Sequence, residues 1–368
     1  MEMRHYITFV IITITLQLFI IVFNRSLAWL FNLSTKTKRF SFVVIFLITN
    51  TIILATVFRI YPMYRLSAAI SIFLLYATFT AILLKWVSWL FRRNKNAQKT
   101  DRTLKLAYPV ILAAIFAMSL YNAYVPKVVH YEIGIDKTLK PLRIGVASDL
   151  HLGKLFGGKQ LDQLADIFNR EKVDLILLPG DIMDDNLLAY RAENMQPHLA
   201  KLKAPLGVYA TLGNHDFFGA QQAIAQAIKR AGIQVLWDQA VTINNEFVIV
   251  GRNDDLERSR PSTVDLLKQV NTKLPVFLMD HRPTEIELHA DLPIDIQVSG
   301  HTHNGQVFPL NFIVSAIYRL SYGYEKIGNG HFFITSGYGF WGIPMRLGSQ
   351  SEVFIIDVKG KNNKENMN

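Results

Sequence analysis

The chain has 368 residues, half of them hydrophobic, and its mean hydropathy is positive at +0.20. The formal net charge of +10 is unevenly divided, because the first 125 residues hold 14 basic and 2 acidic side chains, which leaves 25 basic and 27 acidic side chains beyond them. A nucleic-acid-binding protein would keep its positive charge on the soluble part, so this distribution argues against nucleic acid as a partner.

Four apolar stretches in the first 125 residues are long enough to cross a bilayer, since about 20 helical residues span about 30 Å of hydrocarbon. The first stretch has neither a strongly basic leading segment nor a small-residue cleavage site, so a secretory signal is disfavoured. We therefore expect a transmembrane region in residues 1–125, with helices at about 6–23, 42–58, 66–84 and 106–123.

Basic residues between these stretches predict how the region is oriented. Ten of them lie in the loops after the first and third stretches, whereas three lie on the opposite side. Because basic loops stay in the cytoplasm, we expect a multi-pass inner-membrane protein whose N-terminus and whole soluble part lie outside the cytoplasm. The absence of cysteine is compatible with an oxidising exterior.

Beyond residue 125, short apolar runs alternate with helical patterns, which is typical of an α/β domain. We expect this domain to cover residues 126–358, and the polar residues 359–368 to form a disordered tail. The runs that fit buried strands are 144–147, 175–178, 208–212, 247–250, 276–279, 294–298, 332–335 and 353–358.

Five short motifs place potential metal ligands at or just after the ends of these runs, where α/β proteins gather ligands and catalytic groups. Carboxylate, amide and imidazole ligands without a thiolate suit Mn, Fe, Zn or Ni. The motifs are Asp149-Leu150-His151, Gly180-Asp181-Ile182-Met183-Asp184, Gly213-Asn214-His215-Asp216, Asp280-His281 and Gly300-His301-Thr302-His303.

In this order the motifs resemble the signature of the calcineurin-like metallophosphoesterases, which is D-x-H, G-D-x-x-D, G-N-H-D/E, H and G-H-x-H. The resemblance covers about residues 128–358 and implies a four-layer α/β/β/α sandwich, the metallo-dependent phosphatase fold, behind the four-helix transmembrane region. Further motifs look like the bacterial membrane-anchored branch, whose members act on phosphodiester or pyrophosphate bonds, some of them in lipid-linked envelope precursors. These motifs are Tyr322-Gly323-Tyr324, Ser336-Gly337-Tyr338-Gly339 and Pro344-Met345-Arg346, with Glu352.

The resemblance implies two divalent metal ions, of which we favour manganese. Two ions about 3.5–4 Å apart clamp the attacking and leaving oxygens at phosphorus, so one carboxylate must bridge them, and Asp181 is the candidate. The ions would acidify a bridging water toward a pKa of about 7, and the resulting hydroxide is the expected nucleophile. By resemblance, the coordination of one ion is completed by Asp149, His151 and His303. That of the other is completed by Asn214, His281 and His301.

Other polar residues have roles that the motifs define less closely. By resemblance, His215 donates a proton to the leaving oxygen or stabilises the transition state, and Asp184 orients it. Asp216 either supports a turn or the ligands, or has a direct function. Arg282 and Arg346 either grip a substrate phosphate or form structural salt bridges.

Two side-chain groups keep more than one interpretation. Asp280 either orients the ring of His281 or is a solvated acid. The aromatic residues Tyr338, Phe340 and Trp341 pack in the core, line a pocket or dip toward a membrane interface, where such rings are favoured.

The expected function is a membrane-anchored phosphoesterase that hydrolyses a phosphodiester or pyrophosphate, with lipid-linked envelope substrates included. One alternative is a phosphomonoesterase or phosphoprotein phosphatase, although the arginine usual after G-D-x-x-D is replaced by Asp185. The other is a non-catalytic membrane sensor or transport partner, which the intact motifs disfavour. No feature of the sequence predicts an oligomeric state.

Overall fold

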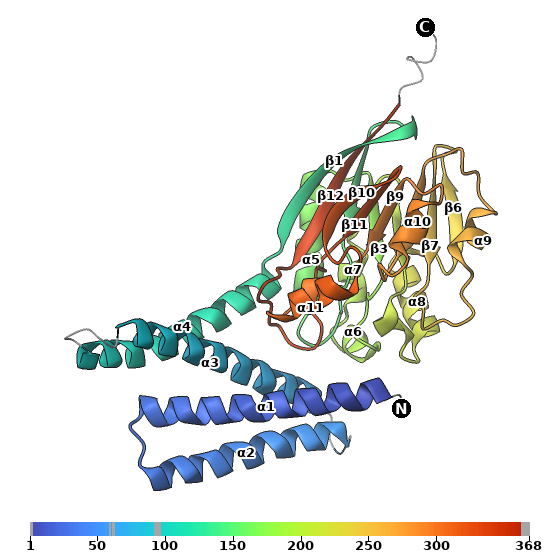
Figure 1. The fold of residues 1–368 in the computed structure, drawn as a ribbon. Helices are drawn as coiled ribbons and strands as arrows, with labels where there is room; N and C mark the ends of the chain where they lie inside the picture. Colours follow the sequence, from blue (N-terminus) through green and yellow to red (C-terminus); the bar gives the residue numbers. More distant parts are fainter. Residues whose placement is uncertain (1–2, 59, 61–62, 92–96, 362–368) are drawn as a thin grey trace. The chain divides into compact units, whose positions relative to one another are not determined.

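The computed structural model describes residues 3–58, 60, 63–91 and 97–361, and the chain divides into two compact units, residues 1–118 and 119–368 (Figure 1). Within the described residues, four helices are long and apolar enough to cross a membrane, by length and composition. The last turns of the fourth helix, from Ser119 onward, belong to the second unit, so the division falls before the predicted boundary at residue 125. The helices are α1 (Met3–Leu30), α2 (Thr35–Val57), α3 (Tyr64–Phe91) and α4 (Ala97–Tyr124).

Each of these helices begins before the predicted apolar stretch, and α1, α3 and α4 also end after it, because helical hydrogen bonding continues through the polar residues at their ends. Several basic residues that we expected in loops therefore lie in helices. The side chain of Ser34 accepts a hydrogen bond from the backbone of Thr37 and so begins α2. The residues concerned are Arg25 in α1, Lys36, Lys38 and Arg39 in α2, Arg65 in α3, and Lys99, Arg102 and Lys105 in α4, while Arg59, Arg92, Arg93 and Lys95 lie outside the described residues.

Two six-stranded sheets form the centre of the second unit (Figure 1). The first has the order β1 (Lys127–Thr138), β12 (Glu352–Lys361), β2 (Leu142–Val146), β3 (Leu175–Pro179), β4 (Val208–Thr211), β5 (Gln234–Val235). The second has the order β10 (Gly323–Ile327), β11 (Gly330–Ile334), β9 (Ile296–Ser299), β8 (Val276–Asp280), β7 (Phe247–Arg252), β6 (Gln239–Ile243). Strands β2 to β5 run parallel to one another in the first sheet, as do β7, β8, β9 and β11 in the second. The pairs β2–β12, β6–β7 and β10–β11 are antiparallel.

Buried apolar side chains fill the space between the sheets and between each sheet and its helices. Between the sheets, Ile144 and Phe354 of the first pack with Ile249 and Phe333 of the second. The first sheet is covered by α5 (Gly158–Glu171), α6 (Leu188–Ala192), α7 (Gln196–Leu199) and α8 (Gln221–Arg230), and the second by α9 (Thr263–Leu267) and α10 (Ile286–Ala290). The layers are therefore α/β/β/α, which confirms the predicted fold class.

Every apolar run that we expected to be a strand overlaps one, but four strands in the part of the chain that the structure describes were not predicted. Of these, β1 is the longest; it pairs in parallel with β12 and alternates exposed with partly buried residues, so its polar content hides it. The same pairing, which joins Thr138 to Lys361, extends β12 to Lys361. Residues 359–361 therefore belong to a strand rather than to the predicted tail, and residues 362–368 lie outside the described residues.

Candidate metal centre

The predicted ligands follow five strands whose carboxyl ends meet at one edge of the sandwich. Asp149 comes after β2, Asp181 after β3 and Asn214 after β4, and these strands are parallel neighbours. His281 and His301 come after β8 and β9, which are parallel neighbours in the other sheet. The structure thus brings together residues that are up to about 150 positions apart, as their strand-end positions predict.

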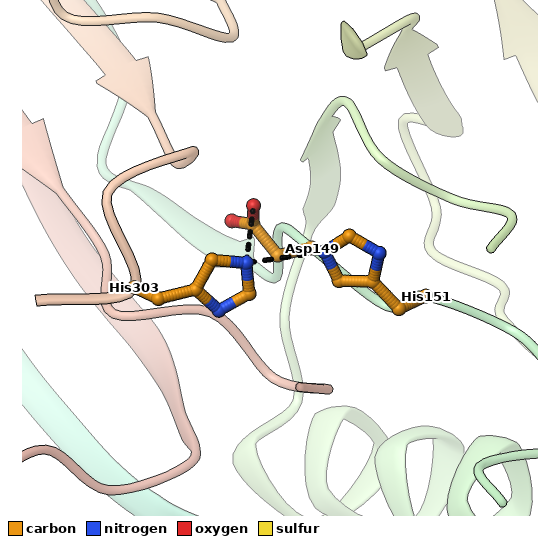
Figure 2. Close-up of side chains that lie close together, drawn as sticks. All are labelled: Asp149, His151 and His303. Carbon is orange, nitrogen blue, oxygen red and sulfur yellow. Dashed lines mark hydrogen bonds and ion pairs between the residues drawn. The ribbon is translucent and has the colours of Figure 1, made fainter. Parts of the chain in front are cut away.

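Asp149, His151 and His303 form the first of two ligand clusters (Figure 2). The Nε2 atoms of the two rings lie 3.1 Å apart, and His303 Nε2 lies 3.4 Å from Asp149 Oδ1. All three side chains are buried, with His303 the most exposed at 8%. Two ring nitrogens that point at each other beside a carboxylate need a shared proton or a cation between them, so these residues fit a divalent ion.

His281, Asn214 and His301 form the second cluster. Asn214 Oδ1 lies 3.2 Å from His281 Nε2 and 2.7 Å from His301 Nδ1. The other ring nitrogen of His281, Nδ1, lies 2.8 Å from the Pro179 carbonyl oxygen and donates to it. That bond leaves the lone pair of the neutral ring on Nε2, the atom that faces the cluster, which is the usual arrangement of a metal-binding histidine.

Asp181 lies between the two clusters. Its Oδ2 atom is 3.7 Å from His151 Nε2 and 3.2 Å from His281 Nε2, and the side chain is buried. Its Oδ1 atom accepts a hydrogen bond from the His215 backbone at 2.8 Å. One carboxylate oxygen therefore faces a ligand of each cluster, which is the placement that a bridging ligand requires.

Five of the seven predicted ligands have a left-handed backbone, a conformation that is uncommon for residues other than glycine. Each such residue costs about 1–3 kcal/mol, and this strain persists only where the surrounding structure imposes it. The residues are Asp149 (φ 54°), His151 (44°), Asp181 (51°), His301 (70°) and His303 (48°). Backbone strain at five ligand positions indicates that the direction of these side chains is maintained at the expense of a more favourable backbone conformation.

Burial controls the protonation of the clusters. It lowers the pKa of His151 and of His301 to about 3, so both rings are neutral and have a lone pair to offer. Burial raises the pKa of Asp149 to about 6. Burial also opposes the charge on His281, but the Asp181 carboxylate outweighs it and raises the pKa of this ring to about 10. Binding a divalent ion at such a cluster releases protons, because ligand nitrogens must be unprotonated.

His215 lies beside the clusters. Its hydrogen-bond partner is Asp185, whereas Asp184 was the predicted partner. Its Nδ1 atom donates to Asp185 Oδ1, and its ring meets that of His151 edge-on, with centroids 4.7 Å apart. Burial disfavours the charged ring, but the bond to Asp185 and the charge of Asp181 outweigh it and raise its pKa. Asp184 also lies near this ring, since one atom each of Asp184, Asp185 and His215 lie within 4.8 Å of one another, and its predicted orienting role stays a prediction.

Sequence reasoning missed Asp185 because its neighbour fills the motif position. The φ of Asp185 is 67°, so the chain turns sharply at this residue and presents its side chain to the ring. The only signal in the sequence was a second carboxylate directly after the motif.

Asp216 is a supporting residue. Its carboxylate is fully buried and accepts hydrogen bonds from the backbone of Ile182, Met183 and Gly213. It therefore ties the loop after β3 to the loop after β4, so that Asp181 and Asn214 keep their spacing. Of the two alternatives for Asp216, the structure favours support of the ligands.

Arg346 has no exposed surface, so of the two roles predicted for it, a grip on substrate phosphate or a structural ion pair, the structure argues against the grip. Its Nη2 atom donates to the carbonyl oxygens of Ser336 and Gly339 at 2.7 and 2.6 Å, and lies 3.1 Å from His303 Nδ1. A guanidinium that is fully buried and donates to backbone carbonyls is enclosed, so it is not available to a substrate. Arg346 instead holds the loop after β11 against the ring of His303.

Replacement of Arg346 should therefore destabilise the fold. We expect Arg346→Met to lower the free energy of unfolding by about 3–5 kcal/mol, because buried carbonyl groups lose their hydrogen-bond donor and the buried carboxylates of Asp149 and Glu352 lose a nearby positive charge. Urea unfolding of the solubilised chain, followed by tryptophan fluorescence, measures the change. Arg319→Met, which removes an exposed pair with Glu325, is the matched control and should leave the midpoint unchanged. Equal midpoints for both variants would contradict the structural role.

Arg282 and Asp280 are both engaged in ion pairs. Arg282 donates through Nε and Nη2 to the two oxygens of Asp254, at 2.5 and 3.0 Å. It therefore forms a structural salt bridge, one of the two roles predicted for it. Any grip of Arg282 on substrate stays a prediction. Asp280 is buried and lies 3.2 Å from Arg252 Nη1, so it is not a solvated acid. Asp254 was not predicted, although it too follows a strand end, that of β7.

Gly300 gives a direct test of the first cluster, because a Cβ atom there would lie 2.1 Å from Asp149 Oδ2 and 2.1 Å from Ser148 Oγ. We expect Gly300→Ala to displace the Asp149 carboxylate and lower metal affinity about 10- to 100-fold, while the chain stays folded. Metal content after dialysis against a chelator series measures this. Gly134→Ala in β1, where the nearest atom is 3.9 Å away, is the control. Full metal retention in Gly300→Ala would contradict the assignment of Asp149.

Comparison with known proteins agrees with this geometry. Residues 142–305 match the family described as calcineurin-like phosphoesterase. An uncharacterized metallophosphoesterase of Aquifex aeolicus (strain VF5) is 35% identical over 265 residues, which are 69% of this chain and 99% of the relative. The chain belongs to the calcineurin-like phosphoesterases.

Two further relatives of this phosphoesterase extend the comparison. A transmembrane protein with metallophosphoesterase domain from Danio rerio is 30% identical over 270 residues, which are 68% of this chain and 61% of the relative. The uncharacterized metallophosphoesterase YkuE of Bacillus subtilis (strain 168) is 29% identical over 224 residues, which are 58% of this chain and 78% of the relative. The chain is thus a phosphoesterase, a hydrolase with candidate metal ligands, and its apolar helices fit a membrane protein.

Proposed function

We propose that this phosphoesterase hydrolyses a phosphodiester or pyrophosphate bond with two divalent metal ions. The observation that carries the proposal is the position of Asp181 Oδ2, which lies within 3.7 Å of a ligand nitrogen in each cluster. Two bound ions would supply a Lewis-acidic clamp and an acidified water, and manganese suits the mixture of ligands. The first cluster is Asp149, His151 and His303, and the second is Asn214, His281 and His301, with Asp181 common to both.

His215 is proposed to hold a proton for the leaving oxygen. Its Nδ1 atom donates to Asp185, which fixes the ring, and the carboxylates of Asp185 and Asp181 raise the pKa of His215 against burial, so that the protonated ring also carries an Nε2–H that can donate toward a substrate. The side chain is 12% exposed, so the ring reaches the surface of the site without being fully solvated. A donor held beside the ligand clusters supports ester cleavage rather than mere phosphate binding.

The catalytic unit is proposed to lie outside the cytoplasm at the inner membrane, and lipid-linked phosphate esters are included among its substrates. The excess of basic residues on one side of the candidate spans supports this orientation. A reporter that is active only in the cytoplasm, fused after Asn368, should be inactive, and a periplasmic reporter at the same point should be active. The reverse pattern would overturn the orientation.

Hydrolysis of bis-p-nitrophenyl phosphate by the purified full chain with added Mn²⁺ tests the proposed activity. We expect turnover that requires the metal and exceeds turnover of p-nitrophenyl phosphate, the monoester. Preference for the monoester would favour a phosphomonoesterase or phosphoprotein phosphatase. No turnover of either ester with any divalent metal, in a chain that melts cooperatively, would favour a non-catalytic sensor or transport partner.

A further inference from the structure

Helix α11 (Leu310–Ile317) leaves its apolar side chains exposed, although it belongs to the folded catalytic unit. It has no buried residue, and Leu310, Phe312, Ile313 and Ile317 are between 46% and 69% exposed. No Asp, Glu, Lys or Arg occurs from His301 to Tyr318. Single exposed apolar residues are ordinary, but a charge-free helix with four of them marks an interaction surface.

Two more exposed aromatic residues lie beside His215, next to the candidate metal centre. Phe218 and Trp341 are 56% and 55% exposed, and their ring centroids lie 5.1 and 6.4 Å from that of His215. Trp341 is joined to the segment before α11, because its backbone N–H donates to Gln306 Oε1 and its carbonyl accepts from Gln306 Nε2, both at 2.9 Å. We name the six residues Leu310, Phe312, Ile313, Ile317, Phe218 and Trp341 the apolar rim.

The apolar rim is linked to the end of a candidate membrane span. The ring of Phe312 packs on that of Phe308, with centroids 5.8 Å apart, and the Phe308 backbone donates to the Leu347 carbonyl at 2.7 Å. The neighbouring Arg346 backbone donates to the Ser119 carbonyl at 3.0 Å. Ser119 lies in the last turns of α4, within the span that ends at Tyr124.

This linkage decides what covers the apolar rim. Since the span ends at Tyr124, the loops that contact residues 119–124 are held close to the bilayer surface. A second contact acts in the same way, because Tyr124 Oη donates to the Leu155 carbonyl at 3.1 Å, and the Leu155 side chain is itself 40% exposed. Tryptophan and phenylalanine at such a place favour the boundary between headgroups and acyl chains.

We propose that the apolar rim docks in the lipid surface of the membrane, with α11 as an interfacial helix. Docking places His215 and the ligand clusters at the level of lipid headgroups, so the site takes phosphate esters whose apolar part stays in the bilayer. The occupant is thus the lipid surface itself, rather than a second copy of the chain or a protein partner. The substrate consequence rests on the proposed phosphoesterase function, whereas the docking does not.

Fluorescence quenching in the full chain tests the docking directly. The chain has no cysteine, so Ile313→Cys and Ile317→Cys each give one labelling site for bimane. The protein is reconstituted in vesicles of phosphatidylcholine and phosphatidylglycerol. We expect lipids with a doxyl group on the acyl chain to quench both labels, and aqueous iodide to quench neither.

The matched control is Val264→Cys. Val264 is an exposed aliphatic residue on α9, the helix that packs against the second sheet. Its label should respond to iodide and not to doxyl lipids. Iodide quenching of the Ile313 and Ile317 labels at the level of this control would overturn the proposal. Efficient oxidation of unlabelled Ile313→Cys to a covalent dimer in dilute vesicles would overturn it too, because a second copy would then cover the helix.

A pair of matched esters tests the consequence for substrate choice. Hexadecyl p-nitrophenyl phosphate in the same vesicles and soluble methyl p-nitrophenyl phosphate present the same reacting bond. The ratio of their turnover rates should fall about tenfold in Ile313→Asp/Ile317→Asp and stay unchanged in Val264→Asp. An unchanged ratio in the rim variant would contradict the substrate consequence. Absence of turnover of both esters in the unmodified chain would contradict the proposed function, while the quenching result would still decide the docking.

Discussion

Asp181→Asn should abolish most of the hydrolytic activity and remove at least one metal ion from the purified protein. The carboxylate is the group that faces both ligand clusters, with Oδ2 3.7 Å from His151 Nε2 and 3.2 Å from His281 Nε2. A neutral amide at this position bridges two cations poorly, and bound ions contribute several kcal/mol to a phosphoryl transition state. We expect turnover of bis-p-nitrophenyl phosphate to fall about a thousandfold or more.

The substitution is chosen to spare the fold. Asn tolerates the left-handed backbone that Asp181 adopts, at φ 51°, better than other residues of its size. Its amide oxygen can still accept the hydrogen bond from the His215 backbone. Metal analysis and turnover are measured together, and Asp166→Asn on the exposed side of α5 makes the same chemical change without effect on either. Full activity in Asp181→Asn with two ions retained would contradict the bridging role.

Much of this site was predictable because its ligands follow strands that the sequence marks clearly. The buried runs before Asp149, Asp181 and His281 are continuous apolar segments, and parallel strands bring their carboxyl ends to one edge. The order of the motifs then implied the rest of the ligand set. The layers of the sandwich followed from the family resemblance, and the buried clusters on both sides of each sheet bear it out.

Side-chain direction in the loops was less predictable. Asp184 and Asp185 are adjacent, and the carboxylate that accepts from His215 is that of Asp185. This choice depends on the left-handed backbone of Asp185, which no pattern in the sequence predicts. Arg346 is a charged residue in a loop, yet carbonyl groups of the loop after β11 enclose its guanidinium. Both differences arise from tertiary contacts, whereas periodicity reports only which face of a helix or strand is buried.

His215→Gln should lower the turnover of phosphodiesters about a hundredfold to ten-thousandfold while both ions stay bound. The ring is a partner of Asp185, not a member of the pairs that join the two ligand clusters, so its removal leaves the ligand atoms in place. The backbone N–H that supports Asp181 is kept when glutamine replaces His215. Metal content equal to that of the unmodified chain is therefore part of the expected result. Loss of the ions in this variant would contradict the assignment.

Comparison of the two carboxylates decides which one orients the ring. Because Asp185 is the residue in hydrogen-bond contact with Nδ1, we expect Asp185→Asn to lose about ten- to a hundredfold in turnover, and Asp184→Asn to lose less. The double variant His215→Gln/Asp185→Asn should be no slower than His215→Gln alone, since Asp185 acts through the ring. Additive losses would show that Asp185 acts independently of His215.

The choice of leaving group separates proton donation by His215 from a structural role. A p-nitrophenolate anion departs without a proton, whereas an alkoxide needs one in the transition state. His215→Gln should therefore slow the cleavage of a dialkyl phosphate, followed by release of the alcohol, more than the cleavage of bis-p-nitrophenyl phosphate. A ring that only supported the ligand loops would change both rates by the same factor. Equal losses for the two esters would assign His215 to positioning, and a greater loss for the alkyl ester would assign the proton to its Nε2 atom.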